Sequence, residues 1–413
     1  MTATMDLEYR SRVAEPASAC ALDASMAGDT PSYEIDILGS LEDAEHIWRS
    51  FERAALMSPY QAFDWVATWH RCFGALERVR PLIVVVRHMG VPSMLLPLGL
   101  IDRSGITKCV FLGGKQINYA MPLLSGDWSE AFGSAPAIET VLKKIKQAEP
   151  SIDLFAFFNQ PRDWHGQKNP MLQLVHKPSP SNSFCVPLRS DYQEFAAGRR
   201  SAKSLSKLRR KEEKIAREIG PIRLIEPVTS SEIDWALDLF RSQRLVRFSA
   251  LGIPDPYQTS QGRQFLREAT LGGEGQGQGT LRWFVLMAGD TPIATFAGTQ
   301  TGRHFSGFIN SMLDGDFAKY SPGEVLLIAV LRRLCAEGVE WFDLGIGEAR
   351  YKEQWCDVDP LVDAVVPMST RGRLVMDVIR RMRGMKRSIK QNTAVFSSLK
   401  RSRAILRRLF LAP

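Results

Sequence analysis

Hydrophobic and polar residues alternate along the first half of the chain in short segments that are typical of strands and helices. Residues 33–37 read Tyr-Glu-Ile-Asp-Ile, an alternation that predicts a half-buried strand. Farther along, Trp and Phe recur at helical spacing, and apolar runs break at Gly90. The pattern predicts helices at 41–54, 61–73 and 135–147, and strands at 33–37, on both sides of Gly90, at 106–112 and at 152–157. We therefore expect residues 33–188 to form a sheet covered by helices.

The second half predicts a similar order of elements with clearer boundaries. Three apolar strands are joined by two short turns, Gly289-Asp290 and Thr301-Gly302, which are typical of hairpins. The predicted elements are helices at 192–219, 231–248, 261–271 and 321–336, a short helix at Tyr351, and strands at 222–227, 281–288, 292–300, 303–312, 340–345 and 364–368. Because the order resembles that of the first half, we expect two copies of one α+β fold. Each copy would hold a mixed sheet flanked by helices, without a detectable sequence repeat.

Charge and composition divide the chain into four regions. The formal net charge is +8, but residues 371–413 hold thirteen Lys/Arg and one acid, Asp377, so this tail carries +12 and the remainder −4 (8 − 12). Residues 1–31 are rich in Ala, Ser, Thr and Pro without periodicity, which predicts a disordered lead. The expected organisation is therefore a lead at 1–31, α+β domains at 32–189 and 190–370, and a basic helical tail at 371–413.

The basic tail also carries apolar residues at helical spacing. They predict two amphipathic helices, of which one packs on the body and the last rests on an anionic membrane surface. The apolar positions are Leu374, Val378, Met382 and Met385 in the first helix, and Leu399, Leu406, Leu409 and Phe410 in the second.

The remaining composition narrows the class of protein. The chain is 45% hydrophobic and 24% charged, which is ordinary for a soluble globular protein. Six scattered cysteines without a CxxC pair indicate reduced thiols in a cytoplasmic protein. Six histidines lack HxxxH or HxxE spacing, so no metal site is expected. No apolar run reaches the length of a membrane span, and the acidic N-terminus lacks the apolar core of a signal peptide.

The most informative segment runs from residue 320 to residue 355. Ser321, Pro322 and Gly323 predict a helix start, and Glu324 completes a capping box with Ser321. A short strand then runs into the segment Asp343-Leu344-Gly345-Ile346-Gly347, and Tyr351-Lys352 follows. Backbone N–H groups at a helix start attract anions, so the segment predicts a site for a ligand that carries a pyrophosphate.

This segment carries a resemblance to a known family. Its string FDLGIGEARYKEQW, at 342–355, resembles the closing motif of the BioF2-like (CelD/BcsL-type) acetyltransferases, which belong to the GNAT superfamily. Three other strings fit the same group: SPYQAFDWVATWHRCFG, FLGGKQINYAMPLL and SLSKLRRKEEKIARE. The group is related to the FemAB/FemX aminoacyltransferases, which are built from two GNAT units. The resemblance, over residues 33–370, implies a tandem GNAT fold.

The resemblance also implies a mechanism without a permanently bound cofactor. An acyl-CoA co-substrate would lie in the gap between two diverging strands, and the acceptor would attack its thioester directly. Asp343 and Glu348 are each a candidate general base or a loop residue, and Tyr351 is a candidate acid or a packing aromatic. Asn310 stands at the functional end of its strand. Lys352 is a phosphate or tRNA contact or a solvated cation. The resemblance assigns donor binding to Ser321, Pro322, Gly323, Gly345, Gly347 and Lys352.

The acceptor side is less well defined by the sequence. Asp64 and Trp65, and the loop residues Asn118 and Tyr119, are candidates for the cleft between the domains. The helix at 198–217 holds nine Lys/Arg and two Glu. Its basic face either is solvated or contacts tRNA, a CoA phosphate or an anionic glycan.

Three functions remain open at this point. The first is an acyl-CoA-dependent acyltransferase that acts on an amine or hydroxyl of a sugar, polysaccharide precursor or small amine, in cell-envelope or cellulose-type exopolysaccharide metabolism. The second is a FemX-like transferase that uses aminoacyl-tRNA. The third is a non-catalytic GNAT-fold scaffold of a polysaccharide synthase. The expected location is cytoplasmic, peripheral at the inner face of the membrane.

Overall fold

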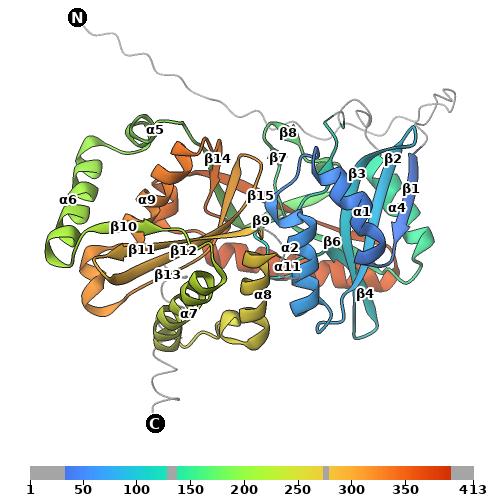
Figure 1. Cartoon of the computed structure of the whole chain (residues 1–413). Helices are drawn as coiled ribbons and strands as arrows, with labels where there is room; N and C mark the ends of the chain where they lie inside the picture. Colours follow the sequence, from blue (N-terminus) through green and yellow to red (C-terminus); the bar gives the residue numbers. More distant parts are fainter. Residues whose placement is uncertain (1–32, 127, 129–136, 273–278, 392–413) are drawn as a thin grey trace, which may run out of the picture. The chain divides into compact units, whose positions relative to one another are not determined.

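The computed structural model describes residues 33–126, 128, 137–272 and 279–391. Across these residues, thirteen strands form one mixed sheet with helices on both faces (Figure 1), and a two-stranded hairpin, β7–β8, lies apart from it. The strands of the large sheet are β1 (Tyr33–Leu38), β2 (Arg80–His88), β3 (Val91–Arg103), β4 (Ile106–Phe111), β5 (Leu123–Leu124), β6 (Leu154–Gln160), β9 (His176–Pro187), β10 (Ile222–Ile225), β11 (Leu281–Ala288), β12 (Thr291–Thr301), β13 (His304–Met312), β14 (Trp341–Asp343) and β15 (Asp357–Pro367). The hairpin strands are β7 (Asp163–Trp164) and β8 (Gln167–Lys168).

The helices lie close to their predicted positions. The α-helices are α1 (Leu41–Glu52), α2 (Phe63–Trp69), α4 (Ala137–Ala148), α5 (Tyr192–Arg199), α6 (Ala202–Glu218), α7 (Ser230–Leu251), α8 (Ser260–Leu271), α9 (Pro322–Ala336), α10 (Arg350–Glu353) and α11 (Thr370–Gln391). The short helical turns are η1 (Pro59–Gln61), η2 (His70–Gly74), η3 (Pro170–Gln173), η4 (Pro256–Gln258) and η6 (Gly315–Tyr320). The single helix predicted at 192–219 is wrong, because Arg200 is extended and Ser201 caps a new helix by accepting the N–H of Ser204.

The two halves of the sheet repeat one topology. In the first half, β1, β2, β3 and β4 are antiparallel neighbours, and β6 joins β4 in parallel. In the second half, β10, β11, β12 and β13 are antiparallel neighbours, and β14 joins β13 in parallel. The expected duplication of one α+β fold is therefore confirmed, although the sequence repeat is not detectable.

The two halves exchange their last strands. Strand β9, which ends the first half, pairs with β14, and strand β15, which ends the second half, pairs with β6. Strands β9 and β15 also pair with each other, so the sheet is continuous across the middle. The expected two separate sheets are thus joined into one, because each half lacks an edge that the other half supplies. The chain boundary predicted near residue 189 remains a prediction.

Helix α11 covers the join between the halves. Its inner face packs on β9, β15 and β6, and Met376 is buried against Leu154 and Val365 (Figure 1). Arg383 donates to Asp363, and Lys390 donates to Ser181. The prediction that one tail helix packs on the body is confirmed; the second tail helix and the predicted lead lie outside the described residues.

Two helical layers position the second half of the sheet. Helix α9 is apolar on most sides and packs its Val325, Ile328 and Leu331 into a core with Phe305 and Phe342. Helices α7 and α8 pack on the other face, beside β13 and β11. Because a strand places alternate side chains on opposite faces, β13 presents different residues to these two layers.

Candidate active site

The parallel strands β13 and β14 separate after a short stretch of pairing. They are paired at only three positions, ending at Ser306 and Asp343. Strand β13 then continues to Met312, while the chain after β14 turns at Gly345 with a φ of +69°. A register shift between β12 and β13 lies beside this point. The wedge between two diverging strands, expected from the sequence, is therefore present.

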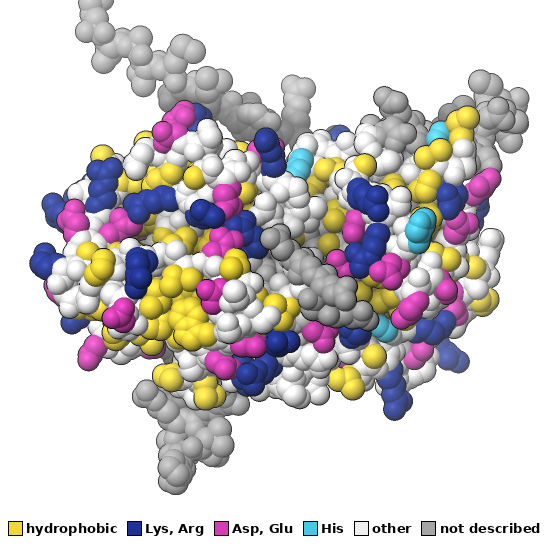
Figure 2. Space-filling model, in the orientation of Figure 1, with side chains coloured by type: hydrophobic (Ala, Val, Ile, Leu, Met, Phe, Trp, Pro, Cys, Tyr) yellow, Lys and Arg dark blue, Asp and Glu magenta, His cyan; other side chains and the backbone are white. Residues whose placement is uncertain are grey.

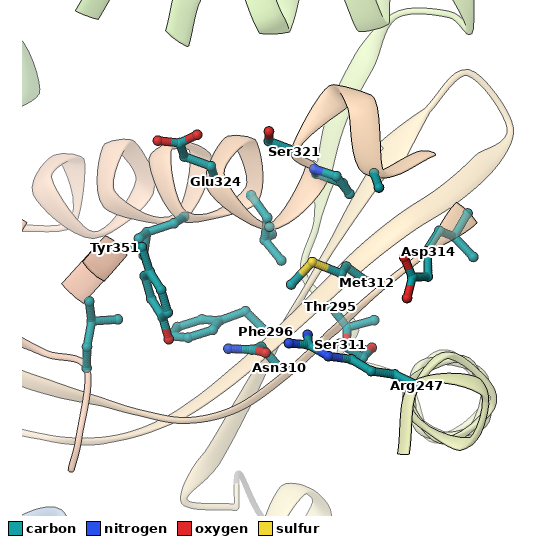
Figure 3. Close-up of a pocket in the computed structure, with 17 residues that line it drawn as sticks. Arg247, Thr295, Phe296, Asn310, Ser311, Met312, Asp314, Ser321, Glu324 and Tyr351 are labelled. Carbon is teal, nitrogen blue, oxygen red and sulfur yellow. Dashed lines mark hydrogen bonds between the residues drawn. The ribbon is translucent and has the colours of Figure 1, made fainter. Parts of the chain in front are cut away.

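A pocket of about 520 Å³ fills the side of the wedge that faces α9. Figure 3 shows its labelled side chains converging from β12, β13, α7, α9 and α10. Among the predicted site residues, five line it: Asn310, Ser321, Pro322, Gly323 and Tyr351. The other lining residues are Arg247, Thr295, Phe296, Ser311, Met312, Leu313, Asp314, Ala318, Glu324, Leu326, Leu327 and Leu344.

The start of α9 differs from its predicted cap. Ser321 has a φ of +54° and its side chain caps no N–H group, so the capping box with Glu324 is wrong. The physical reason is that Ser321 also ends η6 in the left-handed conformation, whereas a capping serine needs extended backbone. Glu324 instead accepts hydrogen bonds from Lys211 at 2.5 Å and from Arg200 at 3.4 Å.

The first turn of α9 nevertheless offers backbone donors to the pocket. The N–H groups of Glu324 and Val325 bond to the carbonyl of Ser321, so the helix geometry leaves the N–H of Gly323 as a donor at the pocket wall. A Cβ on Gly323 would lie 2.7 Å from Cε of Met312. Glycine therefore lets the pocket reach close to the helix start, where the helix dipole favours an anion.

Tyr351 and Asn310 meet across the wedge. The two side chains are hydrogen-bonded, and Figure 3 shows the Tyr351 hydroxyl directed at Asn310 and the ring of Phe296. Burial raises the pKa of Tyr351 above its ordinary value of 10.0, and this rise outweighs the opposing effect of the Asn310 hydrogen bond. The phenol is therefore held protonated beside the pocket and can donate a proton or a hydrogen bond.

Arg247 is a pocket residue that the sequence did not single out. It extends from α7 toward Asn310 and Ser311 (Figure 3) and is exposed. Within the part of the chain that the structure describes, no carboxylate is paired with its guanidinium. No sequence signal distinguishes it from Arg241 and Arg244 on the same helix, because only the fold directs it into the pocket.

Asp343 lies on the other side of the wedge from this pocket. Its side chain is 1% exposed and accepts hydrogen bonds from Tyr119, from the N–H of Gly345 and from Ser306, the last at 2.8 Å. Tyr119 comes from the first half of the chain, so this carboxylate joins the two halves. Burial, with the nearby charge of Asp343, raises the pKa of Tyr119 well above 10.0. The role of Asp343 as a base stays a prediction.

Asn118 extends the same network. It donates to Tyr60 at 2.5 Å and to the carbonyl of Gly307 at 3.2 Å, and Tyr60 donates to Ser306 at 2.9 Å. A Cβ on Gly345 would lie 2.3 Å from Nδ2 of Asn118. Gly345 is therefore needed so that the loop after β14 can pack against the first half of the chain.

Lys352 and Glu348 hold this loop from the other side. Lys352 is 8% exposed, and its ammonium donates to the carbonyls of Ile346 at 2.9 Å and Gly345 at 3.3 Å. Burial lowers its pKa from 10.5 to about 8. Its reading as a solvated cation is wrong, since the ammonium is enclosed. Glu348 is exposed and accepts the N–H of Asn182; neither it nor Gly347 lines the pocket.

The two remaining predicted residues lie on α2. Asp64 is ion-paired with Arg49 of α1 at 2.5 Å. Trp65 is fully buried, and its ring contacts Tyr60, Phe265 and Phe308. Trp65 thus packs α2 against the second half, and neither side chain reaches the pocket around Tyr351.

The basic helix α6 lies beside α9. Figure 2 shows Lys and Arg side chains gathered at the end of the molecule that α6 forms, interspersed with acidic ones. Some of these cations have local partners, because Lys211 pairs with Glu324 and Arg332 of α9 pairs with Glu212. The basic face of α6 is thus partly neutralised by α9.

Comparison with known proteins gives this geometry a family. Residues 202–353, from α6 to α10, match the family described as an acetyltransferase (GNAT) domain. None of the curated proteins compared with the chain matches it. The crystal structure of FemX is similar with a TM-score of 0.55 at 10% identity, covering 83% of this chain and 99% of FemX.

A second solved structure supports the same fold. A conserved protein of unknown function from Bacteroides thetaiotaomicron is similar with a TM-score of 0.51 at 13% identity, covering 81% of this chain and 100% of that protein. Likenesses at such low identity establish the fold alone. Together with the duplicated topology and the wedge beside α9, they make the architecture a tandem GNAT fold. The second half of this chain therefore contains an acetyltransferase domain of the GNAT superfamily.

Proposed function

We propose that this protein transfers an acyl group from acyl-CoA to an amine or hydroxyl acceptor. The observation that carries the proposal is the pocket of about 520 Å³ between the start of α9 and the diverging strands β13 and β14. One end of the pocket offers the first-turn N–H groups of α9, which suit a pyrophosphate. The other end offers Tyr351 and Asn310 beside the wedge, where a thioester would lie.

Each group has a chemical task in this reaction. Arg247 and the N–H of Gly323 hold the phosphates at the pocket mouth. Backbone N–H groups at the wedge polarise the thioester carbonyl, which stabilises the negative charge that develops on its oxygen. Tyr351, which is kept protonated, gives its proton to the departing thiolate. The acceptor attacks directly, so the reaction needs no covalent enzyme intermediate.

A matched pair of glycine variants tests the donor pocket. In Gly323→Leu a branched side chain occupies the pocket mouth, whereas Gly198→Leu places the same side chain on α5, where a Cβ meets nothing within 4 Å. Isothermal titration calorimetry with acetyl-CoA should give an affinity for Gly323→Leu at least about tenfold below that of the unaltered protein and of Gly198→Leu. If the two variants bind acetyl-CoA equally, the pocket assignment is wrong.

The donor itself is tested on the unaltered protein. Thermal stabilisation by acetyl-CoA, or by a longer acyl-CoA, supports the proposal, because a ligand that binds only the folded state raises the melting temperature. Stabilisation only by aminoacyl-tRNA would contradict it and favour a FemX-like donor. No stabilisation by either donor would favour a scaffold. The BioF2-like resemblance of residues 342–355 supports a cell-envelope or exopolysaccharide substrate.

We also propose that α11 rests on an anionic membrane surface. Leu374, Val378, Met382 and Met385 are 56–69% exposed and form one stripe on the face opposite the buried Met376. Arg371, Arg381 and Lys386 border the stripe, so cations flank an apolar face as in interfacial helices. Within the described residues, no helix is both long and apolar enough to cross a bilayer.

Vesicle sedimentation tests the membrane contact. The unaltered chain should sediment with phosphatidylglycerol-containing vesicles and less with phosphatidylcholine vesicles. The double variant Val378→Glu/Met382→Glu should lose this binding, while the same change at exposed apolar residues of another helix, Leu245→Glu/Val246→Glu, should not. Equal sedimentation of both double variants would remove the proposal.

A further inference from the structure

A second pocket, of about 200 Å³, lies on the opposite side of the sheet from the donor pocket. It forms where β9, β13 and β14 meet the β7–β8 hairpin. Asp343 lines it, whereas the next residue, Leu344, lines the donor pocket. Because consecutive side chains of an extended chain point to opposite faces, the two pockets flank the same strand end. An acceptor in the second pocket would approach the wedge from the side opposite the donor.

The second pocket is acidic in a chain whose formal net charge is +8. Asp163, Asp343, Asp357 and Asp359 line it, and no Lys or Arg is among its lining residues. Asp357 is the one with a close cation, at 2.8 Å from Arg199. Burial, together with the charges of Asp163 and Asp343, raises the pKa of Asp359 to about 6, although Arg162 acts in the other direction. The pocket therefore has a negative field that its own walls leave uncompensated.

A buried histidine supplies independent evidence for a missing partner. His304 lines this pocket, is 2% exposed, and has Nδ1 at 2.9 Å from Nε2 of His165. Its Nε2 has no hydrogen-bond partner and lies 3.9 Å from Oδ2 of Asp343. Leaving a buried polar atom unpaired costs about 1–3 kcal/mol, so such an atom calls for an explanation. When Nδ1 donates to His165, Nε2 becomes an acceptor next to a carboxylate, and a cationic N–H donor satisfies both.

We propose that this second pocket binds the acceptor, and that the acceptor is a primary amine that enters as an ammonium ion. The inference rests on the proposed acyl transfer and adds the acceptor class and its site. The ammonium donates to Nε2 of His304 and to Asp343, and Asp359 supplies further negative charge. Asp343, Tyr119 and His304, which come from both halves of the chain, are then shared by the acceptor site and the network that joins the halves.

The transfer balances with this acceptor. The ammonium loses a proton, and the nitrogen lone pair forms a C–N bond with the acyl carbon. The electron pair of the C–S bond leaves with the CoA sulfur, which takes a proton from Tyr351. The second proton released by nitrogen passes to solvent, and Tyr351 regains a proton. The products are an amide, free CoA thiol and one net proton, and no oxidant or reductant is needed.

Matched acceptors and matched variants test the inference. Release of CoA thiol from acetyl-CoA should be faster with butylamine than with butanol, and with glucosamine than with glucose. In Asp359→Asn, and in Asp163→Asn/Asp359→Asn, the KM for the amine should rise by about tenfold with kcat nearly unchanged, because ground-state attraction is removed. Asp290→Asn, on the exposed β11–β12 turn, is the control and should behave like the unaltered protein.

Each outcome separates this inference from the proposed function. If acetyl-CoA binds in calorimetry but the alcohols are the better acceptors, or the KM for amines is unchanged in Asp359→Asn, the acceptor inference is overturned and the transferase proposal stands. If acetyl-CoA does not bind, the transferase proposal fails. Calorimetry with butylamine alone then decides: binding that Asp359→Asn weakens supports the amine site, and absence of binding overturns it. His304→Gln, if folded, should weaken butylamine binding as well.

Discussion

Asn310 of β13 and Tyr351 of α10 are hydrogen-bonded to each other across the gap between two strands that have already separated. The contact closes one wall of the donor pocket without closing the wedge. It also fixes the phenol where a leaving thiolate would form. The tyrosine ring remains 39% exposed, so a ligand can reach it.

Removing the Tyr351 hydroxyl should lower turnover rather than donor affinity. Tyr351→Phe is expected to reduce kcat by about a hundredfold, the usual value of a positioned acid, with little change in KM for acyl-CoA. The acid must be protonated, and burial raises its pKa above 10.0, so its alkaline limb should lie above pH 10. Steady-state kinetics between pH 6 and pH 10 check this, with Tyr192→Phe on α5 as the control. An unchanged kcat in Tyr351→Phe would exclude the acid role.

Neutralising Arg247 should weaken donor binding. Arg247→Ala is expected to raise the KM for acetyl-CoA by about three- to tenfold, because a charge-assisted contact to phosphate is lost at an exposed site. The salt dependence of KM should also become shallower, since salt screens the attraction. Kinetics at two ionic strengths measure both effects, and the exposed Arg373→Ala on α11 serves as the control. Identical salt dependence in both variants would count against a phosphate contact.

Buried Lys352 should make the stability depend on pH in a defined window. Burial lowers its folded-state pKa to about 8, below its ordinary value of 10.5, so the folded state disfavours the charged form. Its penalty is fully present below pH 8 and is relieved as pH rises toward 10.5, a gain of about 2 kcal/mol between pH 7.5 and pH 9.5.

Urea unfolding of the unaltered protein and of Lys352→Met measures this effect as a difference in pH dependence. The buried cysteines, whose pKa values are raised, oppose the gain equally in both proteins, so the comparison cancels them. Lys352→Met should lack the gain. Stability curves that stay parallel between pH 7.5 and pH 9.5 would mean that Lys352 does not titrate in this window.

Adding a methyl group at Gly345 should destabilise the joint between the halves. Gly345→Ala combines a φ of +69° with a Cβ placed 2.3 Å from Asn118, so we expect a loss of about 3 kcal/mol. Gly105→Ala shares a φ of +73° but meets nothing within 4 Å, so it should lose only about 1 kcal/mol. Chemical denaturation compares the two. Equal losses would show that the contact with Asn118 carries no constraint.

The sequence predicted the elements of the second half well because its strands and turns are strongly patterned. The hairpins at Gly289 and Thr301-Gly302 and the helix that begins at Pro322 are where the pattern places them. The sequence also pointed to Ser321, Gly323 and Tyr351 by local spacing, and the fold brings these residues to one pocket. It failed at the cap of α9, because the left-handed conformation of Ser321 depends on η6.

The local pattern of the chain thus determined its strands, its helices, its duplicated order and the anion-binding helix start, since those follow from periodicity and turn chemistry. Only the tertiary structure decided which residues meet. It exchanged β9 and β15 between the halves, placed Tyr119 on Asp343, directed Arg247 into the donor pocket and left His304 without a partner. These contacts join segments far apart in the chain, and a local pattern carries no information about which distant segment will complete a sheet edge or a hydrogen bond.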